Sequence, residues 1–308
     1  MNRATYLALP HPQPGHRVYS MSAIKAFKRC PKSFWFNYIK GLQKIVVPDV
    51  VENGTSFHKI AQAYAEIKRD NLGLEGLTAF QNTFQQDPMF QVFAAWFSRR
   101  AVDEFSDMEI ISVEEPWYLQ VHYNVWIRIT PDLVYVKDGW IYIRDYKTFS
   151  KAPSDPDASL NFQAKLYIGI VGMYQKAQFE HYYVRQDLYH TGKMSNIRWT
   201  AEESYFCEPL KISQQEAIRE LVYTQRLVEY LEYLHLDGTP YDYYHVDHAG
   251  TSPFTCHTCF FKDVCKAESE VGPDRFDELD VASMGYTTER NEHNTISIPD
   301  PAPAFTLK

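Results

Sequence analysis

Two aspartates and a lysine near the middle of the chain have the types and spacing of a hydrolytic metal site. Asp132 follows a proline, and Asp145 and Lys147 follow later within the run D-Y-K. Carboxylates are the ligands that a hard divalent cation such as Mg²⁺ prefers. A neighbouring lysine can orient an attacking water or steady the charge on a phosphate. The pattern predicts metal-assisted hydrolysis, and the alternative is a solvated hairpin with scattered charges.

A tight turn at Asp138-Gly139 predicts how these three residues come together. Asp-Gly favours a two-residue hairpin, and the flanking runs are rich in Val, Ile, Tyr and Trp, as strands are. With this turn Asp132 lies directly opposite Asp145. Side chains alternate along a strand, so Lys147 is expected on the same face as Asp145. We therefore expect two acids and a lysine on one patch of a sheet.

Two helices are expected to bring further polar side chains to the patch of acids and lysine. A helix starting near Gly54 carries His58, and a lone histidine near a helix start is more often structural than a ligand. A helix from about residue 158 to 175 carries Gln163 and Tyr167, which share one face because they are four positions apart. These two could hydrogen-bond a nucleic-acid backbone or brace the loop of the site, and ordinary amphipathic placement is the alternative.

Three of the five cysteines form a C-x2-C-x5-C cluster, namely Cys256, Cys259 and Cys265. An odd number of cysteines without a secretion signal argues against a disulfide framework. Metal ligation by the cluster needs a fourth ligand. The candidates are Cys30, Cys207 and His257, although Cys207 has no metal-type neighbour and is interpreted as a buried thiol.

Composition predicts a globular protein of the cytoplasm. Of the 308 residues, 45% are hydrophobic and 15% aromatic, which is ample for a packed core. The sequence contains no apolar run long enough to span a membrane and no signal peptide. The net charge of −8 at first argues against nucleic acid, but residues 1–48 contain Lys and Arg and no Asp or Glu. That basic run suits a DNA-processing surface, and a solvated helix face is the alternative.

The order of motifs resembles a known family. S-x-I-x-x-F-x-x-C-P, G-x-x-x-H, P-D, D-x-K, Q-x-x-x-Y and C-x2-C-x5-C follow one another between about residues 20 and 266. This order is similar to the PD-(D/E)XK nuclease superfamily, and in particular to its RecB-like iron–sulfur exonucleases of CRISPR-associated and phage type. One departure is Thr130-Pro131 before Asp132, where many relatives carry G-x-x-D.

The resemblance implies an α+β, restriction-endonuclease-like fold with a central mixed sheet flanked by helices. We expect one nuclease domain over residues 21–266. Its further parts are a helical insertion at about 55–105 and a cysteine clamp at 256–265 that closes onto Cys30. Composition adds an irregular N-terminal lead over residues 1–20 and a flexible acidic tail over 267–308.

The resemblance also implies roles for the polar residues. The implied Mg²⁺ or Mn²⁺ ligands are His58, Asp132, Asp145 and the main-chain carbonyl of Tyr146. Lys147 would orient the water, while Gln163 and Tyr167 position the strand that is cut. Some relatives add an acid from the preceding strand, which is predicted over residues 110–121. Glu114 lies there, and an ordinary place on the strand surface is the alternative for it.

In such nucleases Cys30, Cys256, Cys259 and Cys265 would hold a structural [4Fe–4S] cluster, with zinc as the alternative. The implied activity is metal-dependent hydrolysis of DNA, as an exonuclease acting on ends or single strands. Recombination, repair, CRISPR or phage DNA processing would be the context, with protein partners from those pathways. The alternatives are a non-catalytic scaffold that binds DNA ends and a zinc-stabilised protein-interaction module.

Overall fold

The described part of the chain forms two compact units. The computed structural model describes residues 1–45, 49–87, 90, 107–149, 162–174, 177–185, 187–191, 194–198, 205–210, 212–236, 256 and 259–288. The first unit comprises Met1–Pro10, Pro48–Trp117 and Ile129–Leu221, and the second comprises His11–Val47, Tyr118–Arg128 and Val222–Lys308. Each unit is assembled from three separated stretches. For this reason no shift in composition marks a boundary, and the sequence predicted a single domain.

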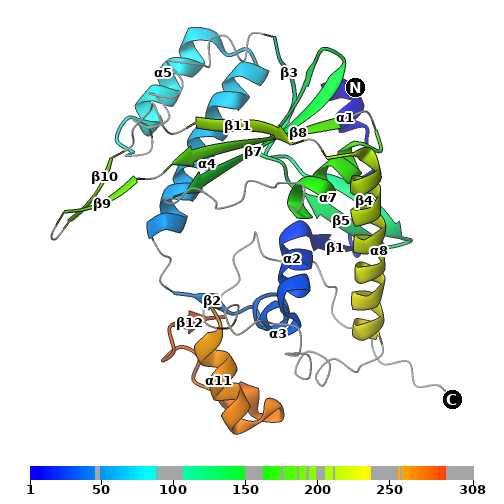
Figure 1. The fold of residues 1–308 in the computed structure, drawn as a ribbon, viewed down its shortest axis with the longest axis vertical. Coiled ribbons are helices and arrows are strands. Elements are labelled where there is room, and N and C mark those ends of the chain that lie inside the picture. The colour runs from blue at the N-terminus through cyan, green and yellow to red at the C-terminus, as the bar shows by residue number, and fades with distance from the viewer. Residues whose placement is uncertain are drawn as a thin grey trace. The chain divides into compact units, whose positions relative to one another are not determined.

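The first unit is built on a five-stranded mixed sheet (Figure 1). Its strand order is β11-β8-β7-β6-β3. β7 and β8 pair in parallel and the other neighbours are antiparallel, so the expected central mixed sheet is confirmed. The strands are β3 (Glu109–Val113), β6 (Leu133–Lys137), β7 (Trp140–Phe149), β8 (Ala177–Arg185) and β11 (Tyr205–Leu210).

The hairpin between β6 and β7 has the predicted register. Lys137 pairs with Trp140 and Leu133 with Arg144. Asp138 and Gly139 both have positive φ, at 51° and 79°, as a type I′ turn requires. The turn therefore determines the pairing along both strands.

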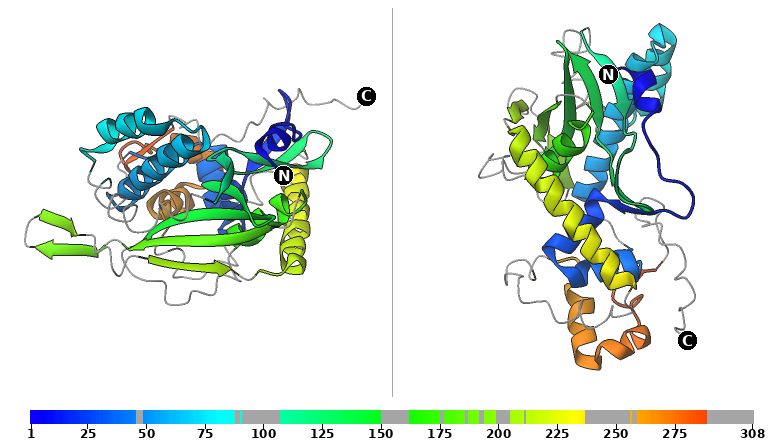
Figure 2. Two further views of the ribbon diagram at one scale, coloured as in Figure 1. Left: turned by 90° about the horizontal axis from the view of Figure 1, so that it is seen from above. Right: turned by 90° about the vertical axis from the view of Figure 1, so that its right-hand side faces the viewer.

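Two helices cover this sheet and supply its core (Figure 2). α4 (Asp49–Arg69) buries Phe57, Ile60 and Tyr64 against β3, β6 and β7, and α5 (Gly73–Phe84) adds Phe80. The spacing of the α4 residues is that of one helical face. They account for the first part of the predicted insertion, while residues 88–89 and 91–106 lie outside the described part of the chain.

α7 (Phe162–Val171) packs tightly against the start of α8 (Gln214–Leu236). A Cβ atom at Gly169 would lie 3.1 Å from the carbonyl oxygen of Ala217 and 3.3 Å from Cβ of Leu221. This close approach anchors a helix that carries Gln163 and Tyr167. The remaining elements of the unit are α1 (Arg3–Leu7) and the two-stranded sheet of β9 (Asp187–Thr191) and β10 (Met194–Arg198).

The second unit joins an early and a late part of the chain. β2 (Gln43–Lys44) pairs with β12 (Tyr286–Thr287), and aromatic side chains from both parts pack together, with the Phe36 and Phe261 ring centroids 5.7 Å apart. The early elements include β1 (Arg17–Ser20), α2 (Met21–Arg29), α3 (Pro31–Phe34) and the π-helix η1 (Trp35–Ile39). β5 (Val125–Ile129) lies between β1 and β4 (Trp117–His122) in a three-stranded sheet, and the late elements are α11 (Lys262–Val271) and η3 (Pro273–Glu278).

Two expectations about the ends of the chain need correction. The lead over residues 1–20 was expected to be irregular, but it contains α1 and β1. The acidic tail was expected to be flexible from residue 267, but α11 continues to Val271 and further elements follow as far as β12. In both places partners distant in the sequence supply the order, because β1 pairs with β5 and β12 pairs with β2.

α8 has 23 residues, a length that would suffice to cross a bilayer. Its buried positions in the second unit are Thr224, Val228, Leu231, Glu232 and Leu234, so this part of the helix buries a charged residue and carries further charges between the buried positions. No helix within the described ranges combines the length and the apolar content of a membrane span.

The close approach at Gly169 predicts that a side chain added there would destabilise the protein. Gly169→Val should lower the free energy of unfolding by about 1–3 kcal/mol, because the added carbons overlap the backbone of α8. Urea unfolding measures this, with Ile218→Val on the exposed side of α8 as the control. An unchanged midpoint for Gly169→Val would contradict the tight α7–α8 contact.

Candidate functional site

Asp132 lies just before β6, at a point where three chain segments meet. Its Oδ2 accepts a hydrogen bond from the N–H of Tyr146 on β7 at 2.5 Å. Its carbonyl accepts the N–H of Glu114 at 3.1 Å. Leu133 pairs with Val113, so β3 ends beside it. The Asp132 side chain is thereby held at the end of the hairpin and is largely buried.

α4 brings an imidazole to this point. Phe57 is fully buried and His58, the next residue on the helix, lies at the edge of the buried face. His58 Nδ1 lies 3.5 Å from Asp132 Oδ2 and 3.7 Å from Glu114 Oε1. One ligand atom from each of His58, Glu114 and Asp132 falls within 4.8 Å of the others. Two carboxylates and an imidazole at this spacing form a donor set that suits a divalent cation.

Glu114, which the sequence offered only as an additional candidate, is the second acid beside His58 and Asp132, while the ligand role of Asp145 remains a prediction. The predicted strand over residues 110–121 is interrupted after Val113, where Glu114 adopts a left-handed backbone with φ of 49°. That conformation is costly for a residue with a side chain, and such strain is concentrated at functional sites. Pro116, shortly after Glu114, was the only sign in the sequence that the strand would end here.

Asp145 is held by a separate hydrogen-bond chain. Its Oδ1 accepts from Gln163 Nε2 at 2.7 Å, and the same nitrogen lies 3.2 Å from the hydroxyl of Tyr167. That hydroxyl donates to the carbonyl of Thr130 at 3.0 Å. Gln163 and Tyr167 are both buried. Their side chains thus connect α7 to β7 and to the segment before Asp132, in agreement with the bracing alternative.

Burial and like charges shift the acid–base properties of the site. Burial raises the pKa of Glu114, the hydrogen bond to His58 lowers it, and the nearby Asp132 carboxylate raises it again. Burial together with the charges of Asp145, Asp132 and Glu114 holds the pKa of Tyr167 well above its usual range. Tyr167 is therefore a neutral hydrogen-bond donor at physiological pH. Ionised Glu114 is less favourable here than in water, so a bound cation would be stabilising.

Two predicted participants remain predictions. Lys147 belongs to β7, where its backbone pairs with Tyr183 on β8, but its side chain lies outside the described part of the structure. The role of the Tyr146 carbonyl as a ligand also remains a prediction, and at the site Tyr146 donates its N–H to the carboxylate of Asp132.

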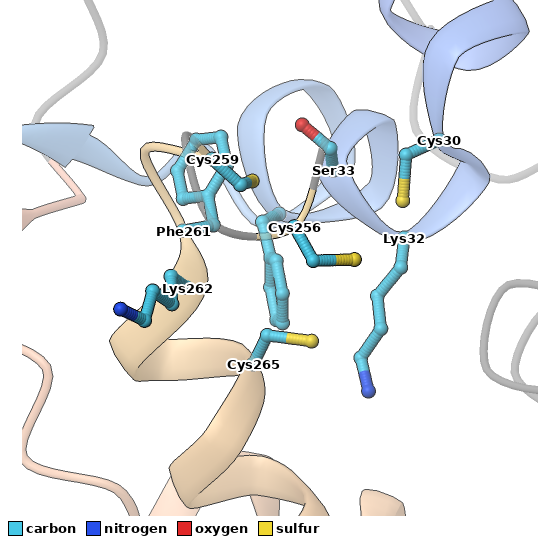
Figure 3. A pocket seen from close by; sticks show the side chains of 9 residues that line it. Cys30, Lys32, Ser33, Cys256, Cys259, Phe261, Lys262 and Cys265 are labelled. Carbon is cyan, nitrogen blue, oxygen red and sulfur yellow. The ribbon is translucent and has the colours of Figure 1, made fainter. Parts of the chain in front are cut away.

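A second cluster lies within the other unit and contains four thiols (Figure 3). Cys30, Cys256, Cys259 and Cys265 line one hollow of about 90 Å³. Cys30 immediately precedes α3 and Cys265 lies on α11, so segments from both ends of the chain contribute. Burial raises the pKa of both thiols, while the backbone N–H groups of Ser33 and Lys32 lower that of Cys30. The sequence offered three candidates for the fourth ligand of the cysteine cluster, and the structure places Cys30 at this hollow. The side chains of the other two candidates, Cys207 and His257, lie outside the described part of the structure.

A comparison with protein families shows to which family the chain belongs. The family described as the PD-(D/E)XK nuclease superfamily matches residues 18–266, which is most of the chain. The chain belongs to the PD-(D/E)XK nuclease superfamily. Membership of this nuclease superfamily suggests a metal-dependent nuclease acting on phosphodiester bonds, and the His58 group could bind the metal.

Other comparisons add little to the superfamily assignment. No curated protein sequence matches the chain. Among solved structures, one titled "Crystal structure of SSO0001" covers 86% of this chain and 91% of its own, with 11% sequence identity and a TM-score of 0.38. A likeness at that TM-score does not establish a shared fold.

The raised pKa of Glu114 predicts how stability depends on pH and metal. A carboxyl group whose pKa is raised in the folded protein binds its proton more tightly there than in the unfolded chain. It therefore lowers the stability of the fold as the pH rises above the pKa that the group has in the unfolded chain. In EDTA at neutral pH, Glu114→Gln should therefore unfold at a higher temperature than wild type, and near about pH 4 the two should converge. Mn²⁺ should raise the unfolding temperature of wild type more than that of the variant.

Glu115, which follows Glu114 in the sequence, provides the control for this stability measurement. Glu115 accepts hydrogen bonds from Arg3 and Arg69, so Glu115→Gln should lower stability by up to about 1 kcal/mol. A Glu114→Gln variant that is less stable than wild type in EDTA at neutral pH would argue against carboxylate repulsion at this site.

Proposed function

We propose that this protein is a metal-dependent deoxyribonuclease whose reaction takes place beside the β6–β7 hairpin. The observation that carries the proposal is the convergence of His58, Glu114 and Asp132 within 4.8 Å, at the end of the β6–β7 hairpin, whose second strand also bears Asp145. A solvated hairpin with scattered charges would not hold two acids and an imidazole together in a partly buried place. Superfamily membership supports the same reading.

The chain supplies binding, orientation and charge. His58, Glu114 and Asp132 would hold Mg²⁺ or Mn²⁺, with Asp145 and the Tyr146 carbonyl as the further ligands that the resemblance implies. The metal supplies Lewis acidity and lowers the pKa of a bound water. Lys147 is two positions beyond Asp145 on β7, so strand alternation supports a place for its ammonium beside the acids, where it would orient the attacking water. Gln163 and Tyr167 would keep Asp145 and the Thr130 segment in place during the reaction.

We further propose that the substrate is DNA with free ends, cut as an exonuclease. The support is the resemblance of the ordered motifs to RecB-like exonucleases and the lack of acids in residues 1–48, which favours phosphate contacts. Recombination, repair, CRISPR or phage DNA processing in the cytoplasm is the proposed context, with a protein partner from such a pathway. A scaffold that only binds DNA ends would share the fold but would not cleave.

Substitutions at the site should remove cleavage without preventing folding. Asp132→Asn, Asp145→Asn and Lys147→Met should each lower the rate of Mn²⁺-dependent cleavage by about 100-fold or more, because each removes charge from the reacting centre. The measurement uses 5′- and 3′-labelled linear DNA and a circular control, with and without Mn²⁺.

The same hairpin offers a matched control. Asp138 is exposed at the turn, far along the strands from Asp132, and Asp138→Asn keeps a residue that tolerates positive φ. It should cleave as wild type does. Wild-type rates for Lys147→Met and Asp145→Asn would overturn the enzymatic proposal, and cleavage of circular DNA as fast as linear DNA would overturn the exonuclease proposal.

We also propose that the four thiols hold a [4Fe–4S] cluster with a structural role. The support is the shared hollow lined by all four thiols and the backbone N–H groups of Ser33 and Lys32 beside Cys30, which favour a thiolate. Cysteine sulfur suits both iron–sulfur clusters and zinc, so the donor set alone does not separate them.

The metal content distinguishes these two possibilities directly. Protein purified anaerobically should be brown, absorb visible light and contain iron and sulfide. The Cys265→Ser variant should lose most of the iron and most of the sulfide. A colourless wild type with stoichiometric zinc would favour the zinc-stabilised module, and a wild type with neither metal would exclude both.

A further inference from the structure

A buried ion pair lies beside the four thiols. Lys32 is 3% exposed and Glu268 is 1% exposed, and the Lys32 ammonium contacts the Glu268 carboxylate. The two residues are 236 positions apart in the sequence. Nothing in the local sequence singles out either residue, because each belongs to an ordinary charged stretch.

Both partners stand on the elements that carry thiols. Lys32 is in the first turn of α3, which Cys30 precedes, and Glu268 follows Cys265 on α11 by three positions, hence on the same helical face. Lys32 lines the hollow with the four cysteines, whereas Glu268 is not among the residues that line it. Figure 3 shows the Lys32 side chain running along the hollow past Cys265. Lys32 is therefore the member of the pair that lines the thiol site.

Stability alone is a poor explanation for this pair. Removing two charges from water costs several kcal/mol, and apolar residues of similar volume often stabilise a fold as well or better. Thiolates around a divalent metal or a cluster bring net negative charge into the same half-buried region. A cation fixed there would offset that charge, and the low local dielectric would strengthen the effect. Lys262 also lines the hollow, but it is exposed and its charge is screened by water.

We propose that Lys32, fixed in place by Glu268, is a positioning residue that offsets the negative charge of the metal-loaded four-thiolate site. The ammonium touches no metal. It acts through the electric field at the thiolates, while Glu268 holds it beside them. The inference rests on the proposed thiolate site and is independent of nuclease activity.

The test measures metal retention in full-length protein purified anaerobically. Iron and zinc are measured before and during incubation with EDTA, for wild type, Lys32→Met, Lys262→Met and the double variant Lys32→Met/Glu268→Gln. Lys32→Met should lose metal roughly 10- to 100-fold faster than wild type, as is typical when groups outside the ligand set are removed. Lys262→Met should behave as wild type.

The double variant separates the electric field from packing. It leaves no unpaired buried charge, so its unfolding temperature should recover to near that of wild type, yet it should still lose metal about 10-fold faster. If the site contains iron, its reduction potential should also become more negative, because a nearby cation favours the reduced state.

Other results would overturn the proposal. Wild-type metal loss and potential in the double variant would reduce Lys32 to a structural role, as would equal effects of Lys32→Met and Lys262→Met. Because the double variant avoids an unpaired charge, it keeps the test valid even if Lys32→Met does not fold. A wild type without metal would instead exclude the thiolate site itself, and neither result depends on cleavage of DNA.

Discussion

Asp132 joins three strands, and the arrangement of the site depends on it. Its carboxylate binds the N–H of Tyr146 on β7, its carbonyl binds the N–H of Glu114 after β3, and β6 begins at the next residue. A carboxylate that accepts a backbone N–H has one orientation instead of several. The imidazole of His58 and the carboxylate of Glu114 therefore meet a fixed partner. Electrostatic groups that are positioned before substrate arrives lose little free energy to reorganisation, which is what metal-assisted hydrolysis requires.

Features set by neighbouring residues could be predicted from the sequence. Asp138-Gly139 specified the turn, and the turn specified the register from Lys137 to Leu133. The face shared by Gln163 and Tyr167 followed from helical spacing, and the structure adds that both are buried. The position of His58 near Asp132 was implied by family resemblance, because nothing in the spacing of α4 indicates which strand it meets.

Features set by distant residues could not be predicted. Glu114 has a left-handed backbone and donates its N–H to the carbonyl of Asp132, a residue distant in the sequence, so the strand was predicted to continue and Glu114 was held only as an additional candidate. Glu268 was assigned to a flexible tail because its stretch is polar, yet it is buried against Lys32. β1 is stabilised by parallel pairing with β5, which short-range patterns do not indicate.

The pairing of early and late segments in the second unit has a consequence for synthesis of the protein. Phe36 and Trp35 are buried against Phe261 and Phe276, which the ribosome adds much later. Until then these rings lack their final neighbours, and a nascent chain with exposed aromatics is prone to aggregate. This unit can therefore complete its core only after Phe276 has been added, and a chain that stalls before that point would leave its early aromatics exposed to chaperones and proteases.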